Sequence, residues 1–511
     1  MKKSGKLLRT MVLVMTMAFC LGLFAPTAAW AAGDALSTEN IKNLLNSEEL
    51  HPQPTGYSEM DALLAQILAP YQNSDTYTKI KVLYDWTVKN IDYSWEGYSK
   101  TTAPAYDCFT LTYDLTYDST LKEAIPKEVI NRSYHALTAR KGVCYDWGAL
   151  FAVMARYVGI EAYVHTGNFI FESGYGRGSG HHGWTELSLG GKNYIFDGQR
   201  EYRLTGNGQK PIQYLYFGIP YGNAWRYTQE TAANAKRDAG FLPVGADRTR
   251  YIKVDAVASR SGSVEGGGSY AVNSAVTLTN ASEIPLEGWY NAGGRLLSTE
   301  DFYTFTAERD TTVYALYAGD YFCDVPAGAW YLRDVSEAVE RQIVSGVTPV
   351  HFRADDKLNR AMAVVLLANA DGAVWSGADY PFKDVAPNAY YAGAVSWAWD
   401  NGIVGGISAD KFAPSGNVTR EQLAVMIIRY LEKEGMALLN SELSYADSGK
   451  ISAYAVDYLE KAQSIGLVGG YEDGTLKPKG TVTRAEGVTM LMRALHCLED
   501  FDSSFEEESA A

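Results

Sequence analysis

The sequence predicts a multidomain protein with an α+β domain, a small all-β domain and an all-α domain, in that order. Its 511 residues exceed what one hydrophobic core normally supports. Helical periodicity gives way to short strands before about residue 240, and alternating strands occupy 249–318. A helical pattern then recurs three times between 319 and 500.

The first 31 residues have the pattern of a secretory signal peptide. Four basic residues begin the chain: Lys2, Lys3, Lys6 and Arg9. The apolar run Met11–Phe24 follows, and Ala29-Trp30-Ala31 offers small residues at the two positions that a signal peptidase reads. An uncleaved anchor is the alternative, but the apolar run is short for a membrane span. We therefore expect a secreted protein with residues 1–31 removed and no membrane span left.

Composition excludes several classes of protein. Lys and Arg total 45 against 60 Asp and Glu, a net charge of −15, and no basic stripe is present, so nucleic acid is not expected as a partner. Four cysteines follow the leader: Cys108, Cys144, Cys323 and Cys497. Their wide spacing does not indicate a disulfide framework, and the absence of a C-x-x-C pair argues against structural zinc. No phosphate, dinucleotide or calcium loop is present, so we expect no cofactor and no metal.

Residues 32–240 predict the α+β domain. Apolar periodicity places helices over Tyr77–Ile91 and Gly142–Tyr157. Strand-like runs follow: Ala162–Thr166, Trp184–Leu189 and Tyr194–Phe196. Cys144 lies in the first turn of the second helix, where the partial positive charge of a helix N-terminus favours a thiolate nucleophile. A lone cysteine here would otherwise be read as a small buried side chain.

Two further residues can complete a thiol site with Cys144. His182 lies in Gly180–Trp184, which we expect to start a strand, and Asp197 ends the next strand. Adjacent antiparallel strands can bring these side chains together. His182 would then pair with the thiolate and protonate the leaving amine, while Asp197 would hold the imidazole tautomer. His181 faces the opposite side of such a strand and is the less favoured base.

These residues resemble the transglutaminase-like superfamily, in its bacterial secreted branch, over about residues 60 to 215. The Gly-x-Cys, His-x-Trp and strand-terminal Asp patterns of that superfamily match Cys144, His182, Trp184 and Asp197. The resemblance implies a papain-like fold and acyl transfer at an amide. It also implies Tyr134 as a side-chain oxyanion donor, beside the backbone N–H of Cys144.

Several outcomes of this chemistry stay open. A cysteine peptidase or amidase and a protein-glutamine acyltransferase share a thioester and differ in whether water or an amine resolves it. We favour hydrolysis of a protein or peptide substrate, because an amine acceptor site must exclude water and no such site is visible. The alternatives are a catalytically inactive binding or scaffold module and a purely structural subunit; an intact Cys-His-Asp triad argues against both.

A run of glycines precedes and surrounds His182. Gly174, Gly176, Gly178, Gly180 and Gly183 fall within ten residues. They predict either a mobile loop over the cleft or a plain hairpin tip.

Residues 249–318 read as strands throughout. Tyr303 and Phe305, and then Val313, Ala315 and Tyr317, alternate with other residues in the period of a strand. One unit of this segment, beginning at Gly288-Trp289-Tyr290, resembles the small β repeats of Listeria and Bacteroides surface proteins. We expect a spacer domain.

The C-terminal region repeats with a period of just over sixty residues. Arg360, Arg420 and Arg484 are 60 and 64 residues apart, and Asp324, Asp384 and Asp447 are 60 and 63 apart. Two markers with matching periods indicate an internal repeat of helix, turn, loop and helix. We place the repeats at 319–375, 376–438 and 439–500, with the aspartates as helix caps and Thr419 capping the second helix of its repeat.

These markers resemble the S-layer homology repeat in its usual set of three. The resemblance implies a helical pseudo-threefold module on a Gram-positive-type cell surface, which binds secondary cell-wall polysaccharide in grooves between repeats. Carried over by position, the groove residues are Arg360, Arg420 and Arg484, whose guanidinium forks suit an anionic glycan. Aromatic residues follow the aspartates and would either stack on sugars or pack the repeat core: Trp330, Tyr390 and Tyr454. The first repeat departs from the family pattern at Asn359 and Met362.

Overall fold

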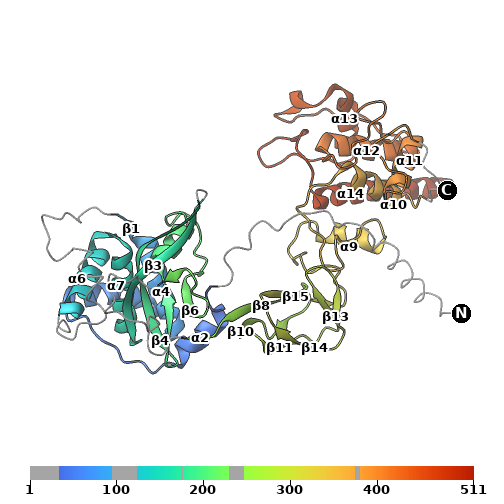
Figure 1. The fold of residues 1–511 in the computed structure, drawn as a ribbon. Helices are drawn as coiled ribbons and strands as arrows, with labels where there is room; N and C mark the ends of the chain where they lie inside the picture. The colour runs from blue at the N-terminus through green and yellow to red at the C-terminus, as the bar shows by residue number, and fades with distance from the viewer. Residues whose placement is uncertain (1–33, 95–123, 174–175, 229–246, 374–379, 511) are drawn as a thin grey trace. The chain divides into compact units, whose positions relative to one another are not determined.

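The computed structural model describes residues 34–94, 124–173, 176–228, 247–373 and 380–510 (Figure 1). The predicted signal peptide and Cys108 lie outside these residues. The chain divides into two compact units. The first unit holds the residues up to Lys253 with Gly268–Ser274 and Ala307–Asp310, and the second unit holds the rest.

The first unit has an α+β fold, as predicted. Its helices are α2 (Thr38–Ser47), α3 (Ser58–Leu68), the 3-10 turn η1 (Ala69–Tyr71), α4 (Thr76–Asn90), α6 (Ala124–Ala139), α7 (Cys144–Val158) and α8 (Gly198–Leu204). Its strands are β1 (Asp92–Tyr93), β2 (Lys141–Gly142), β3 (Ala162–Ser173), β4 (Gly176–Leu189), β5 (Lys192–Phe196), β6 (Phe217–Pro220), β7 (Tyr227–Thr228) and β10 (Gly268–Ala271).

One antiparallel sheet organises the first unit. Its strand order is β6-β5-β4-β3-β7, and α7 packs against β3 and β4 (Figure 1). Buried apolar side chains of α4 and α7, among them Leu83, Tyr84, Leu150 and Phe151, form the main core with the sheet. Because this burial removes a large apolar area from water, it supplies most of the driving force for folding.

Gly176, Gly178, Gly180 and Gly183 lie in strand β4, which corrects the prediction of a loop or hairpin tip at these positions; Gly174 lies outside the described residues. Every residue from Gly176 to Leu187 pairs with β3, so His182 lies well inside β4 and not at its start. Gly178 pairs opposite Phe171, where an added Cβ would lie 2.6 Å from the aromatic ring. Glycine is used here because a side chain would clash, and not because the backbone bends.

The second unit begins with a strand-rich region. Its strands are β8 (Tyr251–Ala258), β9 (Val264–Glu265), β11 (Ser274–Asn280), β12 (Leu286–Asn291), β13 (Leu296–Ser298), β14 (Phe302–Ala307) and β15 (Thr311–Tyr317). Strands β8, β15, β12 and β13 lie side by side in that order, and β14, β11 and β9 form a separate sheet. Trp289 and Tyr317 are completely buried in this region.

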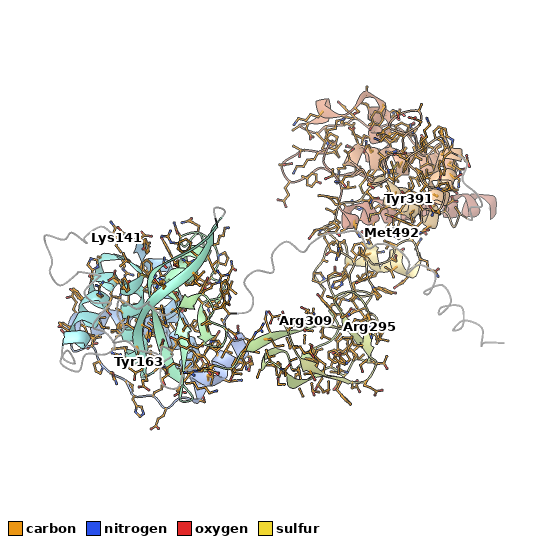
Figure 2. The ribbon with its side chains drawn as sticks, in the orientation of Figure 1. Lys141, Tyr163, Arg295, Arg309, Tyr391 and Met492 are labelled. Atoms are coloured by element: carbon orange, nitrogen blue, oxygen red, sulfur yellow. The ribbon has the colours of Figure 1, made fainter. Side chains whose placement is uncertain are left out.

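The rest of the second unit contains paired helices. These are α9 (Leu332–Glu340), α10 (Arg360–Ala370), α11 (Ala392–Asp400), α12 (Arg420–Lys433), α13 (Val456–Ser464) and α14 (Arg484–Ala510), with 3-10 turns η4 (Ser448–Lys450) and η5 (Ala453–Ala455). Tyr391, before α11, and Met492, in α14, are labelled in Figure 2. Isolated β-bridges join the loops between helices. The all-α module therefore stays a prediction.

The segments that precede the second helix of each repeat close into a ring of backbone hydrogen bonds. The N–H of Leu358 donates to Val482 O at 3.0 Å, Val482 donates to Val418 O at 3.0 Å, and Val418 donates to Leu358 O at 2.9 Å. All three side chains are buried. Each repeat therefore satisfies backbone groups of its neighbours, and all three are joined at one point.

The repeat aspartates are loop clamps, which corrects their prediction as helix caps. Asp384 accepts the backbone N–H groups of Phe412 and Ala413 at 2.8 and 2.7 Å. Asp324 and Asp447 accept the equivalent pairs in their own repeats. The caps are the residues before the arginines: Asn359, Thr419 and Thr483 each accept an N–H from the first helical turn. The prediction that Thr419 caps its helix is confirmed.

Candidate active site

Cys144 is the first residue of α7, as the sequence predicts. Lys141, labelled in Figure 2, precedes it by three residues and helps to locate this end of the helix. The carboxylate of Asp146 accepts the N–H of Val143, the residue before the helix, at 2.7 Å. Arg132 of α6 donates to the other oxygen of Asp146 at 3.1 Å, and both charged side chains are almost completely buried. This buried ion pair fixes the start of the helix on which the thiol is carried.

Two glycines let α7 come close to the sheet. A Cβ on Gly148 of α7 would lie 3.2 Å from backbone atoms of Trp184. A Cβ on Gly183 of β4 would lie 2.6 Å from the ring of Tyr145. Gly148 lies four residues after Cys144, and Tyr145 and Gly183 are next in sequence to Cys144 and His182. The absence of side chains on the two glycines therefore lets the helix lie close to the strand near both residues.

The three residues predicted to act together do lie together. His182 Nε2 is 2.5 Å from Asp197 Oδ2, and Cys144 is near enough to the His182 ring to help raise the pKa of the imidazole. Cys144 is 6% exposed, His182 4% and Asp197 1%. With Nε2 committed to Asp197, Nδ1 is the ring nitrogen that can serve the thiol. The arrangement thus has the order nucleophile, base and orienting carboxylate.

Asp197 accepts hydrogen bonds from residues of several elements. Its Oδ1 accepts the backbone N–H of Arg200 at 3.0 Å, which caps α8, and its Oδ2 accepts the hydroxyl of Tyr227 at 2.8 Å. The hydroxyl of Tyr84, on α4, lies 3.2 Å from Asp197 O. Neither tyrosine was predicted at the site from sequence; Tyr227 follows Asp197 by thirty residues and belongs to no recognisable motif.

A second buried carboxylate, that of Glu201, holds the segment that contacts Asp197. Glu201 of α8 is fully buried and accepts the backbone N–H groups of Gln213, Tyr214 and Tyr216 at 2.8, 2.9 and 3.0 Å. Tyr216 O in turn accepts the N–H of Asp197 at 2.9 Å. The position of Asp197 is therefore set by main-chain contacts as well as by side chains.

The surroundings favour a protonated His182. Burial by itself lowers the pKa of this imidazole, but the charge and hydrogen bond of Asp197, together with those of Cys144, outweigh burial and raise the pKa to about 9. At neutral pH the ring therefore carries a proton that it can donate. A buried imidazolium between a thiol and a carboxylate is the state that general acid catalysis of amide cleavage requires.

The remaining predicted residues of the first unit are placed differently. Tyr134, predicted as an oxyanion donor, gives its hydroxyl to Glu59 Oε2 at 2.8 Å. Its oxyanion role stays a prediction. The side chain of His181 lies outside the described residues, as does Cys108. The described cysteines Cys144, Cys323 and Cys497 form no disulfides.

The three repeat arginines lie at equivalent positions but differ in exposure. Arg360 and Arg484 are each 7% exposed, and each donates twice to backbone carbonyls of another repeat, Arg360 to Phe412 and Gly405 at 2.8 and 2.7 Å. Arg420 is more accessible, donates to Gly469 O at 3.1 Å and lies over the ring of Tyr471. The arginines thus hold neighbouring repeats together, and any role in ligand binding stays a prediction.

The repeat aromatics point into solvent. Trp330 is 63% exposed, Tyr390 64% and Tyr454 52%. Such exposure excludes the alternative that these rings pack the core of the repeats. Large aromatic side chains exposed at the same place in every repeat are available for a ligand.

Comparison with protein families agrees with both sequence resemblances. Residues 64–197 match the transglutaminase-like superfamily. Residues 321–363, 381–424 and 444–486 each match the S-layer homology domain. The chain therefore carries a transglutaminase-like domain, followed by three S-layer homology repeats. The resemblance of 249–318 to the Listeria and Bacteroides repeats stays a prediction.

Known relatives share only part of this organisation. The chain is 33% identical over 191 residues to an endoglucanase of Bacillus sp. (strain KSM-635), covering 37% of this chain and 20% of the endoglucanase. It is 30% identical over 164 residues to the surface-layer 125 kDa protein of Lysinibacillus sphaericus, covering 32% of this chain and 14% of that protein. The chain thus spans a fifth or less of the length of either relative.

Among solved structures, the chain resembles a Cytophaga hutchinsonii protein described as a candidate cysteine protease. The two are 20% identical with a TM-score of 0.19, over 32% of this chain and 43% of the other.

The S-layer homology domains and the surface-layer relative support a cell-surface location. Within the described ranges, no helix combines the length and the hydropathy that crossing a bilayer would require.

Proposed function

We propose that the protein is a secreted, wall-anchored thiol enzyme that cleaves amide bonds of a protein or peptide through Cys144, His182 and Asp197. The thiolate of Cys144 attacks the carbonyl carbon, and the C–N bond breaks as His182 protonates the leaving amine. A thioester on Cys144 results. Water, deprotonated by His182, then attacks the thioester, which releases the acid and returns the thiol.

The observation that supports this proposal most is the position of His182 between the thiol and a buried carboxylate, with a pKa raised to about 9. Because of the raised pKa, His182 is already protonated at pH 7, and the proton that the leaving amine needs is in place before the thiolate attacks. Asp197 supplies the compensating charge. The backbone N–H of Cys144, in the first turn of α7, is the oxyanion donor we favour, with Tyr134 as the second candidate.

Hydrolysis is the preferred outcome over transfer to an amine. Transfer would need an acceptor site that keeps water from the thioester, and we identify no such site among the described residues. A fluorescent primary amine distinguishes hydrolysis from transfer. A hydrolase releases a carboxylic acid whether or not the amine is present, whereas a transferase joins the amine to the acyl group of the substrate.

The S-layer homology repeats would hold this enzyme on secondary cell-wall polysaccharide. Arg360, Arg420 and Arg484 are the candidate cationic groups, and the exposed rings of Trp330, Tyr390 and Tyr454 are candidate stacking surfaces for sugars. The signal peptide predicted at 1–31 would deliver the chain to that surface. An enzyme tethered to the wall suggests wall peptide or a neighbouring surface protein as substrate.

The test is the rate at which iodoacetamide alkylates Cys144, measured across pH by mass spectrometry of its peptide. We expect wild type to react well below about pH 8.5, the pH at which an ordinary thiol is half ionised. The His182→Ala variant should lose this low-pH reactivity. If the two proteins show the same profile, titrating near pH 8.5 or not reacting, the first unit is an inactive scaffold module and the proposal is wrong.

A further inference from the structure

Asp197 has a second side-chain donor in addition to His182. The hydroxyl of Tyr227, on β7, is 2.8 Å from Oδ2 of Asp197, the same oxygen that His182 Nε2 approaches to 2.5 Å. Tyr227 lies beyond residues 64–197, which match the transglutaminase-like superfamily, so no family resemblance assigns it a role.

We propose that Tyr227 is a positioning residue of this site, whose hydroxyl limits how tightly Asp197 holds the proton of His182. The inference rests on the proposed function. Tyr227 thereby joins the His182–Asp197 pair as a third residue, and its hydroxyl lowers the pKa of His182, a role that folding alone does not require.

Packing fixes the tyrosine where this role needs it. Tyr227 is 6% exposed and pairs with Phe169 of β3 across the sheet. Its ring meets those of Phe169 and Trp184 edge-on, at 5.1 and 5.0 Å between centroids. Because Trp184 is two residues from His182 on β4, the ring of Tyr227 is held against the same strand that carries the base. The hydroxyl has little freedom to turn away from Asp197.

His182 and Tyr227 share one oxygen of Asp197, Oδ2. A donor that approaches Oδ2 spreads its negative charge, and this weakens the pull of the carboxylate on the imidazolium. Asp197 keeps the backbone N–H of Arg200 on Oδ1 whether or not the tyrosine hydroxyl is present. Without that hydroxyl the carboxylate should therefore stay in place and become more basic, and His182 should hold its proton to higher pH.

Tyr227 can act as a donor over the whole working range. Burial, followed by the neighbouring charge of Asp197, raises the pKa of the Tyr227 hydroxyl well above its usual value. The other titratable or charged groups around the pair come from several elements: Cys144 of α7, Tyr84 of α4, Arg200 of α8, Glu201 of α8, Tyr216 before β6 and Arg226 before β7. None of these residues changes in the test below.

The test is the pH profile of Cys144 alkylation by iodoacetate in wild type and Tyr227→Phe. This anionic reagent reacts best with a thiolate beside an imidazolium, so the rate should fall as His182 loses its proton, near pH 9 in wild type. Removing the hydroxyl should raise, by about half a unit or more, the pH at which the alkylation rate falls. 3-Fluorotyrosine at position 227 is a more acidic phenol and a stronger donor, so it should lower the pH at which the alkylation rate falls. This substitution tests the inference even if Tyr227→Phe folds poorly.

Tyr221→Phe is the matched control. Tyr221 is 8% exposed, belongs to the same apolar cluster and gives its hydroxyl to another buried carboxylate, Glu186. Both variants should lower the melting temperature by similar amounts, but only Tyr227→Phe should shift the pH at which the alkylation rate falls. A superimposable Tyr227→Phe profile, or an equal shift in Tyr221→Phe, would overturn the inference and leave the proposed function intact. A wild-type profile in which the rate does not fall at alkaline pH, unchanged by His182→Ala, would overturn both.

Discussion

At the scale of single residues, the site depends on side chains that satisfy one another out of contact with water. His182 is 4% exposed and Asp197 1%, so neither charge could be kept there alone. Asp197 has three donors on its two oxygens, which offset the cost of burying a carboxylate. The buried pair Arg132–Asp146 stabilises the start of α7 in the same way.

The charge on His182 makes stability depend on pH. Its folded pKa of about 9 lies above the ordinary value of 6.5, so the stabilisation is complete below pH 6.5 and is lost as pH rises through 9. The shift corresponds to roughly 3 kcal/mol. We expect the free-energy difference between wild type and His182→Gln to shrink from pH 6 to pH 10, in urea unfolding followed by the fluorescence of buried Trp147 and Trp184. A difference that is constant with pH would contradict this assignment of the charge.

At the scale of elements, short polar contacts decide how helices and loops begin. The start of α7 is fixed by Asp146, which accepts the N–H of Val143, and not by a polar residue before the helix. In the repeats, each aspartate ties a distant loop to the start of its own repeat through two backbone N–H groups, as Asp384 does for Phe412 and Ala413. One carboxylate thus satisfies two backbone N–H groups that strand pairing would satisfy in a sheet.

Removing one clamp should destabilise the repeat region measurably. Asp384→Ala leaves two backbone N–H groups without their acceptor, which should cost about 2–3 kcal/mol. Asp410→Ala removes an exposed carboxylate of the same repeat, which pairs with Lys383 and accepts the hydroxyl of Ser408, and it should cost less than about 1 kcal/mol. Thermal unfolding followed by circular dichroism compares the two. Equal losses would show that the clamp contributes no more than a surface charge.

At the scale of the whole molecule, the candidate active site and the repeats lie in different units of the chain. The first unit carries Cys144 and its partners. The second unit carries the repeats, which the ring through Leu358, Val418 and Val482 joins to one another. A ring of this kind leaves each repeat dependent on the other two, so we expect wall binding to require all three.

Wall attachment should depend on the exposed repeat aromatics. Replacing Trp330, Tyr390 and Tyr454 by alanine should weaken binding at least about tenfold, equivalent to 1.4 kcal/mol, with little change in melting temperature because the rings are exposed. Phe302→Ala removes an equally exposed ring, 55% accessible, from the strand-rich region of the same unit and should have no effect. Cosedimentation with purified walls, before and after chemical removal of the polysaccharide, measures both. Unchanged binding by the triple variant would exclude a stacking role.

The sequence predicted the site well where residues near in sequence carry the signal. Cys144 follows a glycine at a helix start, His182 lies two residues before Trp184, and Asp197 ends a strand, so each has a recognisable local context in the sequence. The loop assigned to the glycine run was wrong, because glycine in a strand and glycine in a turn look alike in sequence. Only the opposing Phe171 shows that Gly178 is small to avoid a clash.

By itself, the sequence indicated a transglutaminase-like domain followed by three repeats and the three residues of the candidate active site, because helical and strand periods and short motifs are local properties of the chain. The tertiary structure alone decided which distant groups complete that site. Tyr227 lies 30 residues from Asp197 and Arg132 lies 14 residues from Asp146. In the repeats, the carbonyl groups that accept from Arg360 and Arg484 lie 52 and 132 residues away. Their roles arise only when folding removes water and leaves each buried polar group to find a partner within the protein.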